Sequence, residues 1–183
     1  GGASISGFCE SRNHEIIISV WNGRVYHLDK EKDEFIPYPD KMRSRNPTVM
    51  VQDNEQEYFW LATWGDGVVR FDPSAPEDSM FVYSEIPVNA AGEEDGLILS
   101  LAQDDKLGYI WLTTGHDFMA LQIQPDRTLK QLKFPAGLLP VNHMLVEVLK
   151  GKECLWVSAF DRPSFILHLM DNITKDYALP ALA

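Results

Sequence analysis

The sequence predicts an all-β protein, a β-propeller fragment of four blades, each a four-stranded antiparallel sheet. Three observations predict this fold. A segment rich in Trp, Val, Ile and Leu recurs every 43 to 51 residues, the spacing of propeller blades. Each copy divides into short apolar runs separated by turn residues, as β-strands do. No long stretch has the 3.6-residue apolar period of an amphipathic helix.

The copies align on one another by their tryptophans. Residues 5–29 align without a gap on residues 48–72, which places Trp21 on Trp64. A second repeat position is held by Trp60, Trp111 and Trp156. The first copy has Ile17 there and is therefore atypical. We expect one partial ring over residues 1–183, with blades at about residues 3–39, 47–87, 97–135 and 141–180.

The second copy shows the pattern of strands most clearly. Its four expected strands are about residues 48–52, 58–64, 68–72 and 80–85. Polar links at residues 53–57 and 104–108 predict tight hairpins between the first two strands of the second and third copies. Because the tryptophans at the position of Trp60 recur in mid-strand, we interpret them as core between blades and not as a ring of sugar-binding aromatics.

Composition excludes several classes of protein. The chain has 183 residues, 45% of them hydrophobic, which is enough for a sizeable core. Its 16 Lys and Arg against 27 Asp and Glu leave a net charge of −11, so nucleic acid is not an expected partner. No apolar run approaches the roughly 18 residues of a membrane helix, and this stretch is expected to be soluble. Cys9 and Cys154 have no metal-site spacing, and we expect neither metal nor cofactor.

Two strings carry a resemblance to a known family. Phe-Trp-Leu-Ala-Thr-Trp-Gly-Asp-Gly-Val-Val-Arg-Phe-Asp at residues 59–72 and Tyr-Ile-Trp-Leu-Thr-Thr-Gly at residues 109–115 resemble the two-component regulator propeller repeat. That repeat has an Ile-Trp-aliphatic-Gly-Thr core, a Gly-rich turn and an aliphatic-x-Arg-Phe-Asp strand. The second copy matches best, the third lacks the Arg-Phe-Asp, and the first and fourth keep only parts.

The resemblance implies a sensor. Such repeats form the periplasmic part of hybrid two-component histidine kinases, so the expected function is an extracytoplasmic ligand-sensing module. An oligosaccharide is the expected ligand, and the kinase would lie elsewhere in the membrane-anchored parent chain. The alternative is a protein-interaction propeller without a small ligand. We expect no catalysis in this chain, because it has no Gly-x-Ser-x-Gly elbow and no cysteine placed as a nucleophile.

The candidate binding residues come from the loops between the second and third strands, which share one face of a propeller. They are Trp21, Asn22, Trp64, Asp66, His116, Asp117, Phe160, Asp161 and Arg162. Aromatic rings beside amides, carboxylates and a guanidinium suit a carbohydrate, because a ring face stacks on the sugar while polar groups bind its hydroxyls. The alternative is that the tryptophans pack on top of the blades and the charges are solvated.

A polar position recurs on the third strand of each copy. It is filled by His27, Arg70, Gln122 and His168, and strand alternation predicts an outward face for it.

Neither end of the array has a polar capping surface. The first copy contains Ile16-Ile17-Ile18-Ser19-Val20, which is apolar on both strand faces, and the fourth contains Cys154-Leu155-Trp156-Val157. We therefore expect half a ring, closed by further blades or by a second copy in an eight-bladed homodimer. A closed four-bladed ring is also possible. In the dimer, blade four of one copy would abut blade one of the other and could bring Cys154 towards Cys9.

Overall fold

The computed structural model places four antiparallel sheets in sequence order. It describes residues 4–43, 46–89, 91–104, 107–115 and 117–132, together with the backbone of strands 143–149, 152–158 and 165–168. Within these residues, no helix is long and apolar enough to cross a membrane.

Each sheet is a meander that we call a blade. Blade 1 consists of β1 (Ser4–Glu10), β2 (Ile16–Trp21), β3 (Val25–Asp29) and β4 (Glu34–Pro37). Blade 2 consists of β5 (Pro47–Gln52), β6 (Phe59–Thr63), β7 (Val68–Phe71) and β8 (Phe81–Tyr83), with a short 3-10 turn η1 (Glu77–Ser79) before β8. Blade 3 consists of β9 (Ile98–Asp104), β10 (Tyr109–Thr114), β11 (Phe118–Ile123) and β12 (Leu129–Leu132). In blade 4 the described strands are β13 (His143–Leu149), β14 (Lys152–Ser158) and β15 (Phe165–His168).

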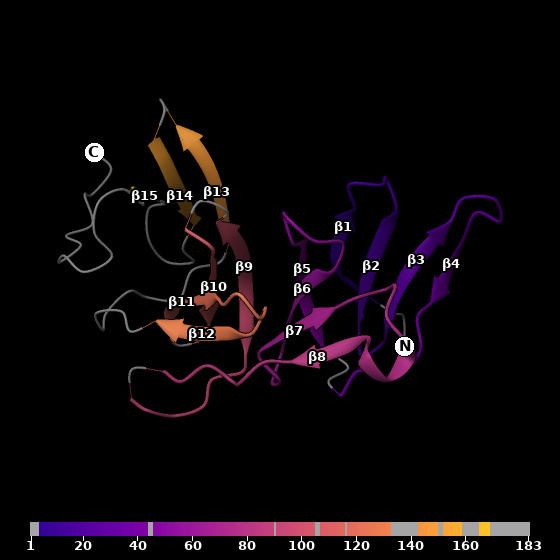
Figure 1. Ribbon diagram of the computed structural model, residues 1–183, viewed down its shortest axis with the longest axis horizontal. Helices are drawn as coiled ribbons and strands as arrows, with labels where there is room; N and C mark the ends of the chain where they lie inside the picture. The colour runs from indigo at the N-terminus through magenta and orange to yellow at the C-terminus, as the bar shows by residue number, and fades with distance from the viewer. Residues whose placement is uncertain are drawn as a thin grey trace.

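The blades stand beside one another with their first strands in contact. β1 contacts β5, β5 contacts β9, and β9 contacts β13, so these first strands are the inner strands of the array. Figure 1 shows the sheets following one another from blade 1 on the right to blades 3 and 4 on the left. This confirms the all-β propeller-type fold predicted from the repeats.

Two apolar layers between blades form the described core. Between blades 1 and 2, Ile17 and Val25 pack on the layer that contains Phe59, Leu61 and Phe71. Between blades 2 and 3, the buried side chains are Tyr58, Trp60, Ala62 and Val68 from blade 2 and Ile98, Leu101, Ile110, Leu112, Met119 and Leu121 from blade 3. The full burial of Trp60 confirms that this repeated tryptophan is core.

A buried hydrogen bond between aspartate and tryptophan recurs in blades 2 and 3. Trp60 Nε1 donates to Asp53 Oδ2 at 2.8 Å, and Trp111 Nε1 donates to Asp104 Oδ2 at 3.2 Å. Both carboxylates are fully buried, and Oδ1 of each accepts backbone N–H groups from the following turn, which include that of Glu55. The aspartate thus joins the hairpin turn to the core indole. Blade 1 has neither partner, because Glu10 and Ile17 hold these two repeat positions.

Two arginines from neighbouring blades hold the β5–β6 turn of blade 2. Arg12 of blade 1 donates from Nη1 to the carbonyls of Asp53 (2.9 Å) and Asn54 (2.6 Å), and it also contacts the carbonyl of Gln56. Arg127 of blade 3 donates to Glu55 Oε2 at 2.7 Å and lies 3.9 Å from Asp53 Oδ1. Backbone carbonyls and carboxylates of one turn thereby bind three blades together.

The register of the third strands corrects one expectation from the sequence. His27 pairs with Ile17 and Arg70 pairs with Trp60, but Ala120 pairs with Trp111 and Ile166 with Trp156. Gln122 and His168 therefore do not share the repeat position of His27, because the turn between the second and third strands differs in length from blade to blade. The position is also not outward, since His27 faces blade 2 with its ring 5.0 Å from that of Tyr38.

The position of Cys9 bears on the expected approach of the two cysteines in a dimer. Cys9 pairs with Ile17 on the face of blade 1 that packs against blade 2, and burial raises the pKa of its thiol. A chain docking on the opposite face of blade 1 would therefore not meet Cys9. The side chain of Cys154 lies outside the described residues.

We predict that Asp104→Ala destabilises the fold by about 1–3 kcal/mol, because it removes the buried carboxylate that accepts the indole N–H of Trp111. Urea unfolding followed by tryptophan fluorescence measures the change. Asp126→Ala is the matched control, since Asp126 also accepts bonds from its own turn but is exposed, and it should shift the midpoint less. Equal midpoints for Asp104→Ala and the parent would show that the buried bond does not support the hairpin.

We also predict a loss of stability at alkaline pH that involves two tyrosines. Burial raises the pKa of Tyr38 to about 12, and burial together with the charge of Asp53 raises that of Tyr58 to about 12. Because folding favours the neutral phenols, their stabilising contribution is complete below pH 10 and is lost as the pH rises towards 12. Titration by tyrosinate absorbance should show late steps for these two phenols, and Tyr58→Phe should remove one of them.

Candidate functional site

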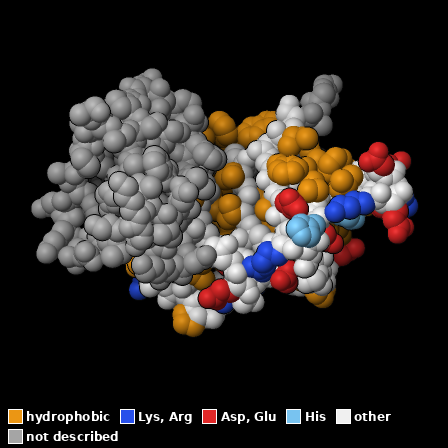
Figure 2. Space-filling model, turned by 90° about the horizontal axis from the view of Figure 1, so that it is seen from above, with side chains coloured by type: hydrophobic (Ala, Val, Ile, Leu, Met, Phe, Trp, Pro, Cys, Tyr) orange, Lys and Arg blue, Asp and Glu red, His pale blue; other side chains and the backbone are white. Residues whose placement is uncertain are grey.

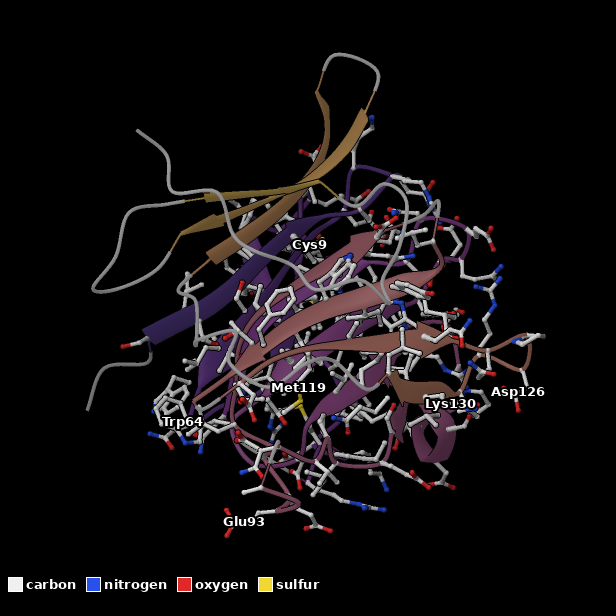
Figure 3. All side chains as sticks on the ribbon, turned by 90° about the vertical axis from the view of Figure 1, so that its left-hand side faces the viewer. Cys9, Trp64, Glu93, Met119, Asp126 and Lys130 are labelled. Carbon is white, nitrogen blue, oxygen red and sulfur yellow. The ribbon has the colours of Figure 1, made fainter. Side chains whose placement is uncertain are left out.

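In blades 1 to 3, the turns that follow the second strand lie at one end of the array, which we call the top. The turns at the opposite end, the bottom, include the one that carries Asp126. Figure 3 shows Trp64 and Asp126 at opposite ends of the molecule. The top therefore collects the candidate binding residues from blades 1 to 3 that the structure describes: Trp21, Asn22, Trp64, Asp66 and Asp117.

A threonine fixes the top turn in blades 2 and 3. Thr63 Oγ1 accepts the backbone N–H of Asp66 at 3.0 Å and donates to the carbonyl of Gly67 at 2.9 Å. In blade 3, Thr114 Oγ1 accepts the backbone N–H of Asp117 at 2.9 Å. Both aspartates therefore donate their backbone N–H to this threonine, but the turn of blade 3 is one residue shorter, and the carbonyl of Asp117 takes the place of that of Gly67. Gly67 has a φ of 69°, a conformation that favours glycine.

Trp21 and Trp64 form an aromatic pair across the boundary between blades 1 and 2. Their ring centroids are 5.2 Å apart and their planes meet at 79°, an edge-to-face arrangement. Trp64 is 46% exposed although its ring is packed on Trp21, so one surface of the indole faces solvent. Asn22 follows Trp21 with a φ of 57° and is exposed at the turn. The structure thus brings together the two tryptophans that the repeat placed at one position.

The connection from blade 2 to blade 3 supports the backbone of Trp64. The carbonyl of Gly96 accepts the N–H groups of Gly65 (2.8 Å) and Gly67 (3.2 Å), and Trp64 and Leu97 form an isolated β-bridge. A Cβ atom at Gly96 would collide with the carbonyl of Gly65, so glycine is required for this close approach. The backbone N–H of Trp64 donates to the carbonyl of Asn46, from the preceding connection, at 2.8 Å.

A glutamine anchors the same connection to blade 3. Gln131 of β12 donates from Nε2 to the carbonyl of Val88 at 2.6 Å and accepts the N–H of Val88 at 2.7 Å. The side-chain amide thus takes the place of a pairing strand. Asn89 then forms a turn in which its Oδ1 accepts the N–H groups of Ala91 and Glu93, both at 3.0 Å. These bonds fix the start of the connection whose end, at Gly96, contacts the backbone next to Trp64.

Three cationic side chains have a carboxylate or an aromatic ring as partner. They lie on the connection between blades 1 and 2 and on the neighbouring top turn. Arg24 pairs with Asp40 at 3.1 Å, and Lys41 lies 3.6 Å from Asp78. The guanidinium of Arg43 lies 4.4 Å from the ring centroid of Tyr83. Among the described residues of this region, these cations are thus paired or stacked, while Asn22 and Asp66 lie on the turns beside the tryptophan pair.

Four of the predicted binding residues lie outside the described residues: His116, Phe160, Asp161 and Arg162. The geometry thus joins Trp21 and Trp64 directly and places Asn22, Asp66 and Asp117 on turns at the same end. In the part of the chain that the structure describes, no group of three or more His, Cys, Asp or Glu side chains could hold a metal ion.

A small cavity lies at the bottom, between blades 2 and 3. Its volume is about 250 Å³, below the roughly 300–1,000 Å³ typical of ligand pockets. The residues that line it are Glu55, Gln103, Gly108, Ile123, Gln124, Pro125 and Arg127. The two charged residues that line the cavity, Arg127 and Glu55, form an ion pair with each other. The candidate site therefore remains at the top.

The sequence did not indicate the roles of Asn46, Gly96 and Gln131 in supporting Trp64. Gly96 ends an acidic connection, and a glycine there is a weak signal of a close backbone approach. Gln131 lies 43 residues from Val88, and nothing in the repeat marks the pair.

Comparison with known proteins supports the fold. No protein-family model matches the chain, and no curated protein matches its sequence. Among solved structures, PorZ of Porphyromonas gingivalis, a surface component of the type-IX secretion system, superposes with a TM-score of 0.68 at 15% identity, over 92% of this chain and 26% of PorZ. The extracellular domain of the putative hybrid two-component system BT3049 of B. thetaiotaomicron gives 0.60 at 22% identity, over 90% and 21% of the two chains.

A third similar structure is an enzyme. Virginiamycin B lyase of Staphylococcus aureus gives a TM-score of 0.61 at 12% identity, over 92% of this chain and 57% of the lyase. The chain thus spans about a quarter or less of PorZ and of the BT3049 domain, and the fold alone is common to all three. The structural similarity to the BT3049 domain agrees with the resemblance of the repeats to two-component regulator propellers.

We predict that Gln131→Leu loosens the connection over the top of blade 2, because both bonds to Val88 are lost. Hydrogen exchange of the Val88 amide should become faster, with a smaller effect at Gly65. Gln131→Glu keeps the acceptor for the Val88 N–H and should protect this amide more than Gln131→Leu does. Unchanged exchange in Gln131→Leu would mean that the connection is held by its own turn.

Proposed function

We propose that this chain is part of the extracytoplasmic ligand-sensing propeller of a two-component sensor histidine kinase, and that its top surface binds an oligosaccharide. The observation that carries the proposal is the aromatic pair of Trp21 and Trp64, with Trp64 46% exposed on a surface that also presents Asn22 and Asp66. An indole face stacks on the C–H face of a pyranose, and amide and carboxylate oxygens accept bonds from its hydroxyls.

The two-component role is supported by two independent likenesses. The motif at residues 59–72 resembles the two-component regulator repeat, and the fold superposes on an extracellular domain of a putative hybrid two-component system. A sensor of this type needs no catalytic group of its own. The chain contributes ligand binding, and the kinase would lie elsewhere in the parent protein on the other side of a membrane.

The charges of the described surface favour a neutral sugar. The nearby arginines and lysine have partners, while Asp66 presents a half-exposed carboxylate beside the exposed indole. A uronic acid or a sulfated sugar would meet this carboxylate with a charge of the same sign. We therefore propose neutral oligosaccharides as the ligand class.

The mechanism of sensing would use the boundary between blades 1 and 2. The two tryptophans come from different blades, and the backbone of Trp64 is bonded to the connections that precede and follow blade 2. A sugar that stacks on Trp64 would favour one relative position of these blades. Ligand binding would thus be linked to blade packing, which the rest of a receptor could sense.

The test is calorimetric titration with neutral hexasaccharides of glucose, xylose and mannose and with oligogalacturonides of similar length. We expect binding of at least one neutral probe, and a loss of about tenfold in affinity for Trp64→Ala. Val82→Ala, which truncates an exposed apolar side chain on β8, should bind as the parent does. Failure of all probes would favour a protein-interaction propeller. Binding unaffected by Trp64→Ala would place the ligand elsewhere.

A further inference from the structure

The small cavity at the bottom lies where blades 2 and 3 meet. Gln103 of β9 pairs with Ile110, which is buried against blade 2, so the side chain of Gln103 also lies between the two blades. Glu55 lines the cavity from blade 2, and Gln124 and Arg127 line it from blade 3. The two blades thus enclose a space with polar side chains from both, whereas the layer above it is apolar.

Gln103 brings a buried hydrogen-bond acceptor to this cavity. Its Oε1 atom is buried, and among the described residues no group donates a hydrogen bond to it. Burying a carbonyl oxygen without a donor is unfavourable, because the atom has given up its bonds to water. A molecule in the cavity that carries an O–H or N–H group would supply the missing donor.

The turn between β11 and β12 holds Arg127 beside the cavity. Arg127 has a φ of 64°, which is uncommon for a residue other than glycine, and its N–H donates to the carbonyl of Gln124 at 2.8 Å. Its guanidinium donates to Glu55 across the blade boundary at 2.7 Å. The pair presents donors and acceptors side by side while its charges cancel, which suits neighbouring hydroxyls of a neutral molecule. Figure 2 shows acidic and basic side chains interspersed on the described surface, and such a surface has no large field of one sign to attract an ion.

The size and the remaining lining of the cavity indicate a single sugar ring. Its volume of about 250 Å³ is that of about eight water molecules at about 30 Å³ each, which is room for one monosaccharide and not for an oligosaccharide. Gly108 keeps this room free, since a Cβ atom there would meet no atom within 4 Å. Ile123 and Pro125 add apolar surface for the C–H groups of a pyranose, and the amides and the ion pair can bind its hydroxyls.

We infer that the cavity binds one neutral monosaccharide, with Gln103 Oε1 accepting a bond from one hydroxyl and the Arg127–Glu55 pair bound to neighbouring hydroxyls. This site is separate from the top surface, because Figure 3 shows Asp126, the neighbour of Arg127, at the opposite end of the molecule from Trp64. The inference therefore does not depend on an oligosaccharide at the top. Because blades 2 and 3 both contact the sugar, its binding also stabilises their packing.

The test is titration of the 183-residue chain with D-glucose, D-xylose and D-glucuronate, followed by NMR of the side-chain amides. At least one neutral pyranose should shift the signals of Gln103 and Gln124, and glucuronate should bind at least about tenfold more weakly. Gln103→Leu removes the buried acceptor and should weaken binding of the neutral sugar at least about tenfold, measured on Gln124. Gln122→Leu is the matched control, because Gln122 lies on β11 outside the lining of the cavity, and it should bind as the parent does.

A second variant keeps the test decisive if Gln103→Leu does not fold. Gly108 has a φ of 66°, a conformation that asparagine tolerates, so Gly108→Asn takes up room at the cavity and should also weaken binding.

Three outcomes would overturn the inference. The first is that neither neutral sugar shifts Gln103 or Gln124 up to the limit of its solubility, as expected if the cavity holds only water. The second is a shift of the Trp64 indole without one of Gln103, which would place the sugar at the top. The third is unchanged affinity in Gln103→Leu and Gly108→Asn while circular dichroism shows both variants folded.

Discussion

The structure depends on one constraint: each sheet is apolar on both faces and needs a neighbouring sheet on each side. Strands that face water on one side alternate apolar and polar residues, whereas β6 is buried along its whole length. Its neighbours on either side are blades 1 and 3, which bury Phe59 and Trp60 respectively. Local strand pairing forms a blade, but contact between blades makes it stable. The top surface is a consequence of this arrangement.

Much of the fold could be predicted from the sequence because it is repeated. The second, third and fourth copies have tryptophan at the same position, and this shows how the copies correspond. The structure confirms both the strands and the burial of Trp60. The alignment failed at the third strand, where Ala120 takes the place expected for Gln122. A β-turn can change length at little energetic cost on the surface, and such changes leave no trace in the apolar pattern.

The candidate site was less predictable than the fold. The repeat placed Trp21 and Trp64 on equivalent turns, and propeller geometry brings such turns together at one end. Sequence could not show that Gln131 holds Val88 or that Gly96 supports Gly65, because these bonds join residues outside the repeat pattern. It also could not show that the aspartates of the hairpin links bind the core tryptophans. An aspartate in a turn is ordinarily a surface residue, and only its burial beside an indole N–H reveals the role.

The two arginines that hold the β5–β6 turn have a consequence for cooperativity. In a simple repeat array each unit interacts only through its faces, and the ends can fray while the middle stays folded. Here Arg12 and Arg127 reach from blades 1 and 3 to the same five-residue turn, and their bonds span 41 and 72 residues of sequence. Loss of blade 1 or of blade 3 removes charge-assisted bonds from blade 2 as well as apolar contact. These bonds therefore couple the unfolding of blades 1 to 3.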